Sequence, residues 1–475
     1  MALHFFASQC SKGWMTDFSS LLQADRGQAA CKIHMVDTQS FDTWLASQST
    51  RTRTACAAGR FTGKADELVI LSGDTPEEWS VAIGVSNVAA PAPWCLAAAA
   101  QRLPAGTYRL VDGTPGDRAL GWLLAQHRFS RYRKNGADEG PRVLLTSDPA
   151  AINSAIRMAE ATALVRDLVD TPAEDLGPAE LAEAVEAEAA QFGATVNIVQ
   201  GEQLRSGFPS VHAVGRAAAK AARLIDLTWG NPDHPRITLV GKGVTFDSGG
   251  LDIKPSSGMR HMKKDMGGAA HALALARLVM QSNLPVRLRL LIPAVENAIA
   301  GNAFRPGDIL ATRKGLTVEI GNTDAEGRLV LSDALTCAQE DKPALLLDFA
   351  TLTGAARVAL GPDLPALFTN DDGLAQDLSV AATDTDDPLW RMPLWQPYKD
   401  LLKSEIADIG NASESAFAGC ITAALFLERF IDPGTVWAHI DLFAWRPSAK
   451  PGRPKGGEAM TIRAIWRMLQ TRYGS

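Results

Sequence analysis

The chain contains 475 residues, more than one hydrophobic core usually holds, so we expect two domains. Its hydrophobic content of 46% and charged content of 21% are typical of an ordinary soluble protein, and its net charge of −6 gives no general attraction to nucleic acid. Met1 to Trp14 lacks a sustained apolar core and no membrane-length apolar run occurs, which argues against secretion or membrane insertion. Six scattered cysteines without a C-x-x-C pair favour a reducing, cytoplasmic location.

Residues 1–148 are expected to form a small α/β domain. Its predicted strands are 68–71, 82–84 and 143–145, and its predicted helices are 38–46, 94–102 and 118–126. The segment contains no cluster of histidine, cysteine or acidic residues, so we assign no chemistry to it. A helix over residues 149–170 is expected to link it to a larger domain that covers residues 171–475.

A long connection follows a predicted strand at 236–240 and precedes a predicted helix at 267–280. Four charged residues lie in it, among many glycines: Lys242, Asp247, Lys254 and Asp265. Long connections without secondary structure of their own are uncommon and are often functional. The glycines permit the backbone to approach an ion closely. The connection is therefore a candidate site.

A second charged run, Asn322–Leu329, lies between a predicted strand at 316–320 and a predicted helix at 330–339. It presents Asp324, Glu326 and Arg328 beside a glycine. Taken alone, this pattern is also that of a polar turn whose aspartate caps the next helix. The upstream carboxylates favour a shared site instead.

Four carboxylates gathered in one place need counter-charge, because like charges oppose each other's ionisation. Two divalent cations would balance them and would activate the attacking and polarised oxygens of a hydrolytic reaction. Ligation rich in oxygen suits manganese or zinc, with magnesium as a further candidate, and the lack of thiolate and imidazole disfavours copper and structural zinc. The residues therefore predict a di-metal hydrolase.

The same segments resemble the signatures of the leucyl (cytosol) aminopeptidase family, whose members are di-metal exopeptidases. The resemblance rests on Lys242–Gly250, Lys254-Pro255, Met262–Gly268 and Asn322–Leu329, and further matches are Leu164–Pro172, Asn297–Asp308 and Asp348–Gly354. It covers roughly residues 160–430 and is poor before residue 120. It implies an α/β fold with a small assembly or regulatory domain, a larger catalytic domain with a mixed, mainly parallel sheet flanked by helices, and a homohexamer.

The resemblance also implies roles for the charged residues. Asp247 and Glu326 match ligands that bridge the two metals, and Asp324 matches a further ligand of one site. Lys242 and Asp265 match the ligands of the other, more exchangeable site, where Lys242 must be deprotonated because an ammonium has no free lone pair. Two catalytic residues remain. Lys254 matches the lysine that polarises the scissile carbonyl, and Arg328 matches the arginine that holds a bicarbonate as general base.

Four residues match positions that line the family's pocket for the first side chain: Met262, Thr351, Leu352 and Gly354. Methionine is an adaptable wall for aliphatic side chains, although core packing is an equal alternative for Met262. The chain departs from the family at Phe443, which stands after a His-x-Asp strand where members usually show an Ala-Gly stretch. Phe443 is expected to narrow or reshape the pocket.

The expected function is the release of N-terminal residues, such as leucine, methionine or another apolar residue, from peptides with a free amine. His261 and His271 flank Asp265 and are expected to be structural. Three alternatives remain open: a DNA-binding architectural member of the same fold, a dipeptidase of narrow specificity, and a di-metal phosphatase or amidohydrolase. Neither a membrane nor a nucleic acid is an expected partner.

Overall fold

A computed structural model describes residues 16–75, 77–133 and 140–474. These residues form two compact units. The smaller unit contains the described residues from 16 to 163 together with Ser448–Lys455. The larger unit contains Leu164–Pro447 and the described residues from Gly456 onward. Helix α6, Ala150–Asp170, runs from the first unit into the second.

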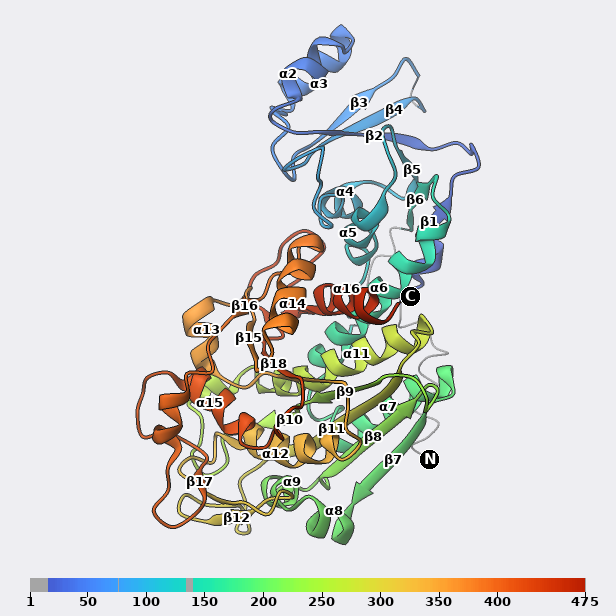
Figure 1. The fold of residues 1–475 in the computed structure, drawn as a ribbon. Coiled ribbons are helices and arrows are strands. Elements are labelled where there is room, and N and C mark those ends of the chain that lie inside the picture. Colours follow the sequence, from blue (N-terminus) through green and yellow to red (C-terminus); the bar gives the residue numbers. More distant parts are fainter. Residues whose placement is uncertain (1–15, 76, 134–139, 475) are drawn as a thin grey trace. The chain divides into compact units, whose positions relative to one another are not determined.

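The smaller unit is built on a sheet in the order β1-β6-β5-β2-β4-β3 (Figure 1). Its strands are β1 (Leu22–Ala24), β2 (Cys31–Val36), β3 (Leu68–Ser72), β4 (Trp79–Gly84), β5 (Gly106–Leu110) and β6 (Arg142–Thr146). Its helical elements are η1 (Phe18–Ser20), α2 (Phe41–Ala46), α3 (Thr50–Ala58), α4 (Ala97–Arg102), η2 (Gly116–Arg118) and α5 (Ala119–Leu124). Neighbouring strands run parallel except β3 and β4. The predicted α/β character of this part is confirmed.

The larger unit is built on a mixed sheet in the order β16-β15-β18-β14-β9-β11-β8-β7, with β10 paired to β11. The strands of this sheet are β7 (Thr195–Gln200), β8 (Arg223–Trp229), β9 (Arg236–Gly241), β10 (Gly243–Asp247), β11 (Arg287–Asn297), β14 (Leu345–Ala350), β15 (Ala366–Thr369), β16 (Trp390–Arg391) and β18 (Trp437–Asp441). Strands β18, β14, β9 and β11 are mutually parallel at its centre, and antiparallel pairs flank them. This sheet is the mixed, mainly parallel one expected from the sequence.

Short strands form two small sheets beside it: β12 (Ile309–Ala311), β13 (Thr317–Glu319) and β17 (Ile409–Gly410) in one, and β19 (Trp445–Arg446) and β20 (Gly456–Gly457) in the other. The helical elements are α7 (Pro178–Phe192), α8 (Gly201–Gly207), α9 (Pro209–Gly215), α10 (Ser256–Met259), η3 (Met262–Met266), α11 (Gly267–Gln281), α12 (Glu326–Gln339), α13 (Gly354–Leu360), α14 (Asp372–Asp384), η4 (Gln396–Leu402), α15 (Gly419–Glu428) and α16 (Ile462–Tyr473).

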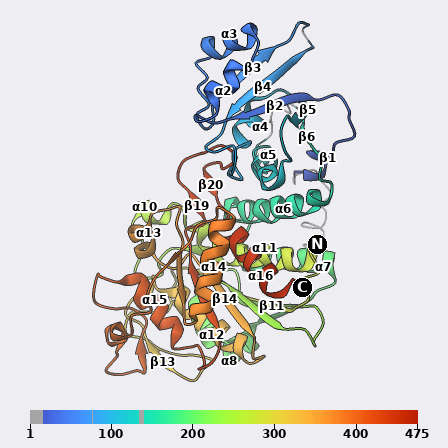
Figure 2. The same ribbon diagram turned by 45° about the horizontal axis from the view of Figure 1, so that its top comes forward.

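Helices α11 and α12 cover opposite faces of the central strands (Figures 1 and 2). Successive residues of a strand point to opposite faces, and the end of β9 shows both directions. A Cβ on Gly241 would lie 2.5 Å from the Cα of Ala269 in α11, whereas the side chain of Lys242 reaches Gly327 in α12. The alternation therefore aims Lys242 at the start of α12.

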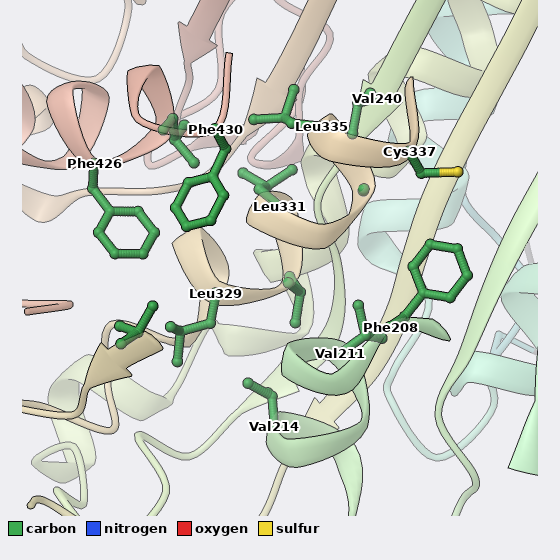
Figure 3. Packing of buried hydrophobic residues seen from close by; sticks show 14 of the residues in the cluster. Phe208, Val211, Val214, Val240, Leu329, Leu331, Leu335, Cys337, Phe426 and Phe430 are labelled. Atoms are coloured by element: carbon green, nitrogen blue, oxygen red, sulfur yellow. The ribbon is translucent and has the colours of Figure 1, made fainter. Parts of the chain in front are cut away.

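A buried apolar cluster holds α12 in place (Figure 3). Leu329, Leu331 and Leu335 of α12 pack among aromatic and aliphatic side chains that include Val211 of α9 and Phe426 of α15. Burial of each such side chain stabilises the fold by roughly 1.5–3 kcal/mol. The cluster fixes the helix whose first turn carries Glu326 and Arg328.

The connection from Lys242 to Asp265 differs from the sequence expectation. It is not free of secondary structure, because it contains β10, α10 and the start of η3. Strand β10 runs parallel to β11, with a register shift between Val244 and Asp247. Strand β10 is held by a partner strand far along the chain, and it is short and lies among glycines. The glycine-rich sequence therefore predicts a loop.

Among the described residues, no helix is long and apolar enough to cross a membrane.

Candidate active site

The charged residues of the long connection (the first motif) and of the run Asn322–Leu329 (the second motif) meet where parallel strands of the larger unit end. Lys242 directly follows β9, Asp247 ends β10, Asp265 lies on η3 and Glu326 begins α12. Ligands of open α/β sheets bind at this carboxyl edge. One carboxylate oxygen from each of Asp247, Asp265 and Glu326 lies within 4.8 Å of the others.

Two ammonium groups each lie between two carboxylates. Lys242 Nζ is 2.7 Å from Asp265 Oδ2 and 2.9 Å from Glu326 Oε1. Lys254 Nζ is 2.8 Å from Asp247 Oδ2 and 2.5 Å from Asp324 Oδ1. The structure thus brings together both lysines and all four acidic residues that the sequence selects.

Gly327 makes room for Lys242. A Cβ at this position would lie 2.6 Å from Lys242 Nζ and 2.5 Å from its Cε, closer than a side chain tolerates. Because the glycine is the second residue of α12, a side chain there would displace the lysine from Glu326, its neighbour on the same helix. The glycine of the second motif therefore has a steric role.

Burial and mutual repulsion shift the ionisation of the acidic residues. Burial, followed by the negative charge of Asp247, raises the pKa of Glu326 to about 8. The same two causes raise the pKa of Asp324 to about 6, although Lys254 acts against them. Burial also acts to raise the pKa of Asp265, but the nearby charge of Lys242 outweighs it and the pKa is lowered. The cluster carries more negative charge than its two lysines neutralise easily.

Burial acts to lower the pKa of both lysines, and their carboxylate neighbours outweigh it. Asp265 and Glu326 raise the pKa of Lys242, and Asp247 raises the pKa of Lys254. Both groups are therefore ammonium ions in this arrangement. Deprotonation of Lys242 requires a cation that replaces the proton as partner of the carboxylates.

Neutral donors orient the carboxylates from behind. Asn297, fully buried at the end of β11, donates from Nδ2 to Asp247 Oδ1 at 2.9 Å. Thr351 donates from its hydroxyl to Asp265 Oδ1 at 2.7 Å. The sequence reasoning gave Asn297 no role and assigned Thr351 only to the pocket wall. Asn297 lies within a segment that resembles the family, which is the signal that points to it.

Arg328 lies on the first turn of α12, one residue beyond Gly327. Its Nη1 donates to the backbone oxygen of Asn411 at 2.7 Å, and its buried Nε has no hydrogen-bond partner among the described residues. Burial lowers the pKa of Arg328 to about 10, against the raising effect of Glu326. The group remains a cation at neutral pH and offers an N–H to an anion.

The donor set fits divalent metal ions. The buried oxygens Asp265 Oδ2, Asp324 Oδ1 and Glu326 Oε1 have only a lysine ammonium as partner. Glu326 Oε2 has no hydrogen-bond partner within the described part of the chain, which is rare for a buried polar atom. These are hard oxygen donors around a single lysine nitrogen, a set that suits manganese, zinc or magnesium. The residues present therefore match the metal centre expected from the sequence.

The acidic cluster opens into a cavity of about 340 Å³. Its lining includes the four residues expected in the pocket, namely Met262, Thr351, Leu352 and Gly354, and also Phe443. Lys264 and Arg357 line it as well, and the sequence reasoning selected neither. Lys264 stands in a run of two lysines and Arg357 on an otherwise ordinary helix, so neither had a pattern that set it apart.

His261 and His271 remain outside the acidic cluster. His261 stacks on Trp445, with ring centroids 4.8 Å apart. His271 is fully buried in α11, where Nδ1 lies 2.7 Å from the oxygen of Gly267 and Nε2 accepts from the backbone N–H of Met460 at 2.9 Å. Neither belongs to the acidic cluster of the described residues, and His261 also lines the cavity.

Comparison with known proteins covers both units. The profile of the "Cytosol aminopeptidase family, catalytic domain" matches residues 163–466, and that of the "M17 aminopeptidase, N-terminal domain" matches residues 31–145. The probable cytosol aminopeptidase of Syntrophotalea carbinolica is 41% identical over 367 residues, which is 74% of this chain and 73% of that protein.

Solved structures agree with these profiles. The cytosol aminopeptidase of Coxiella burnetii is 47% identical, with a TM-score of 0.90 over 95% of this chain and 99% of that one. The bottromycin maturation enzyme BotP, solved in complex with Mn, is 32% identical, with a TM-score of 0.84 over 96% of this chain and 99% of that one.

The fold and the carboxylate centre define a metal-dependent aminopeptidase, a class of hydrolase. The chain belongs to the cytosol aminopeptidase family, M17.

Proposed function

We propose that the protein releases N-terminal residues from peptides with a free α-amine by means of two divalent metal ions in each subunit. The observation that carries the proposal is the convergence of Asp247, Asp265, Asp324 and Glu326 on Lys242 and Lys254 at the mouth of one cavity.

Asp247 and Glu326 are the proposed bridging ligands, with Asp324 completing one metal site and Lys242 and Asp265 the other. The ions are manganese or zinc, with magnesium as a further candidate. Two such cations would supply Lewis-acid activation of a water molecule and of the scissile carbonyl. The buried oxygens of Asp265, Asp324 and Glu326, which meet a lysine ammonium and no other hydrogen-bond donor among the described residues, support this assignment.

Lys254 is the proposed electrophilic residue. Its Nζ lines the cavity between Asp247 and Asp324, whose charges keep it protonated. With divalent ions as partners of these carboxylates, the ammonium would donate to the carbonyl oxygen of the substrate. Positive charge aimed where an oxyanion develops lowers the barrier of acyl transfer.

Arg328 is the proposed anion holder for the general base. Its Nε–H has no partner among the described residues, while Nη1 is anchored on Asn411. Arg328 would use this free N–H to hold a bicarbonate beside the reaction centre, and the bicarbonate would accept the proton of the water. No histidine belongs to the acidic cluster of the described residues, which is consistent with a base that is not a side chain.

The proposed pocket for the first side chain is lined by Met262, Thr351, Leu352 and Gly354, with Phe443 as a wall. Leucine and methionine are proposed substrates, since Met262 offers an adaptable apolar surface. We further propose a homohexameric assembly in the cytoplasm. The free thiols of the described cysteines, Cys31, Cys56, Cys95, Cys337 and Cys420, are consistent with a reducing compartment.

The test is hydrolysis of leucine, methionine and alanine p-nitroanilides, with Mn²⁺ or with chelator, and N-acetyl-leucine p-nitroanilide as the blocked control. Metal-dependent release from the free-amine substrates alone supports the proposal. A protein that binds two metal ions but hydrolyses none of the free-amine substrates contradicts it. Dipeptides and a gel shift at physiological salt then test the dipeptidase and DNA-binding alternatives.

A further inference from the structure

We infer that the pocket for the first side chain selects carboxylate side chains, so that N-terminal glutamate and aspartate are hydrolysed faster than glutamine and asparagine. The inference rests on the proposed function, because it concerns the same pocket. It is carried by two cationic side chains that line the cavity. Lys264 has only a long ion pair with Asp265, and Arg357 makes no ion pair among the described residues.

Lys264 is a buried ammonium with little to neutralise it. The residue is only 5% exposed, and its Nζ makes no hydrogen bond to any described residue. Its ion pair with Asp265 Oδ1 is long, at 3.9 Å, and that oxygen already accepts from Thr351. A buried cation of this kind is costly unless an anion pairs with it.

Arg357 adds a second positive charge to the same wall. It stands on α13 one turn after Gly354, with Nη2 4.0 Å from the position of a Cβ on that glycine. The residue is exposed, and its guanidinium makes neither a hydrogen bond nor an ion pair among the described residues. Arg357 is therefore available to a ligand in the cavity.

Both cations lie against the ring of Phe443. Lys264 Nζ lies 5.3 Å from the centroid of the Phe443 ring, and the guanidinium carbon of Arg357 lies 4.7 Å from it. The ring offers cation–π attraction but no counter-charge. The residue that departs from the family pattern is thus the platform of a positively charged wall.

A further carboxylate of the cavity, Asp441, is hydrogen-bonded to the chain itself. Asp441 lines the cavity, but its Oδ1 accepts from the backbone N–H groups of Leu352 and Thr353 at 2.9 and 3.2 Å. Its Oδ2 accepts from the hydroxyl of Thr353 at 2.6 Å. These bonds direct the carboxylate at the loop after β14, so its oxygens are already engaged by donors other than Lys264 and Arg357.

The wall lies where the first side chain is proposed to lie. Lys264 is two residues after Met262, and Arg357 is three after Gly354, so each cation extends an element that already lines the pocket. A carboxylate that receives charge-assisted hydrogen bonds from both would be favoured over its neutral amide isostere by roughly tenfold or more.

The experiment compares kcat/KM of the manganese-loaded enzyme for the tripeptide amides X-Ala-Ala, where X is Glu, Gln, Asp, Asn, Leu or Lys. Amides are used because they remove the C-terminal carboxylate. We expect glutamate to exceed glutamine, and aspartate to exceed asparagine, by about tenfold. Lys264→Met and Arg357→Gln should each remove most of this ratio, which compares two substrates of the same enzyme sample and therefore does not depend on its overall rate.

Charge reversal gives the sharpest variant, because Arg357 is exposed and its substitution should not disturb folding. Arg357→Glu should lower the Glu/Gln ratio below one and raise release of N-terminal lysine. Lys403→Met and Arg205→Gln are matched controls, since both side chains are exposed and neither belongs to the cavity lining. Both variants should keep the Glu/Gln ratio of the wild type.

A Glu/Gln ratio of one or less in the wild-type enzyme, or a ratio that survives both Lys264→Met and Arg357→Glu, overturns the inference. A preference for peptide acids over peptide amides, without a Glu/Gln difference, also overturns it and assigns the cations to the C-terminal carboxylate of a dipeptide. Release of none of the residues, leucine included, is instead a failure of the proposed function.

Discussion

Asn297 Nδ2 lies 2.9 Å from Asp247 Oδ1 and fixes that oxygen, while Oδ2 of the same carboxylate faces Lys254. The amide also donates to the backbone oxygen of Thr323, in the second motif. One fully buried side chain therefore aligns the acidic residue of the first motif with the backbone of the second.

This alignment predicts that Asn297→Leu weakens metal binding. Residues that orient metal ligands typically contribute about 10- to 100-fold to affinity, so the dissociation constant for Mn²⁺ should rise by that factor. Titration calorimetry on the chelator-treated protein measures it. Asn302→Leu, on the exposed loop after β11, is the control and should leave the constant unchanged. An unaltered constant in Asn297→Leu would remove Asn297 from the metal centre.

The short approach between Gly327 and Lys242 predicts that Gly327→Ala disables the enzyme without unfolding it. The added methyl must move Lys242 by the better part of an ångström, and such misplacement can cost about 100-fold in rate. Gly301→Ala is the matched control, because nothing lies within 4 Å of a Cβ there. Circular dichroism checks the fold and p-nitroanilide hydrolysis checks the rate. Full activity in Gly327→Ala would refute the steric role of the glycine.

His271 predicts a loss of stability in acid. Burial lowers the pKa of His271 to about 4 from an ordinary 6.5, since Nε2 must stay unprotonated to accept from Met460. A folded-state pKa below the unfolded one gives stability that is present above 6.5 and is lost as the pH falls toward 4. The slope is at most about 1.4 kcal/mol per pH unit, or about 3 kcal/mol in total.

Urea unfolding of the wild type and of His271→Gln, measured at about every half pH unit from about pH 7.5 to about pH 4, tests this loss of stability. The free-energy difference between the two proteins should shrink as the pH falls, because only the wild type must keep a histidine neutral. His234→Gln, in the loop before β9, should show no such convergence. Parallel curves for wild type and His271→Gln would exclude His271 as the source.

The carboxylate centre predicts that metal ions stabilise the fold. A ligand bound only by the folded state adds about 2.7 kcal/mol at 100 times its dissociation constant, so Mn²⁺ should raise the unfolding free energy by that amount. Asp247→Asn combined with Glu326→Gln should abolish the gain, because both proposed bridging ligands lose their charge. Thermal unfolding with and without Mn²⁺ measures it. An equal gain in the double variant would place the metal elsewhere.

The sequence predicted the fold class, most of the strands and helices it named, and the residues that gather at the centre of the site. It succeeded where the signal is local, as in the alternation before Lys242 and the charged run before α12. It placed the start of α12 at Val330, because the apolar pattern begins there, whereas the helix begins at Glu326. The difference matters, since it places Glu326 and Arg328 on one helical turn.

Features set by distant pairing were not predictable. Strand β10 depends on β11, and the role of Asn297 depends on where that strand ends. The positively charged wall depends on Phe443, Lys264 and Arg357, which lie far apart in the sequence and share no motif. A lone lysine or arginine in a sequence is most often on the surface, and only the fold reveals which cation faces a cavity.

The return of Ser448–Lys455 to the smaller unit has a consequence for how the protein can be divided. The segment leaves β19 and re-enters at β20, which pair with each other through Trp445 and Gly457. Over residues 16–474, as far as they are described, the chain therefore passes between the units at three points, and a single cut after residue 163 separates neither unit intact. A truncated protein that begins at Leu164 would still contain Ser448–Lys455, a segment that belongs to the smaller unit. Removal of the smaller unit therefore also requires deletion of this segment, with a short turn that joins β19 directly to β20.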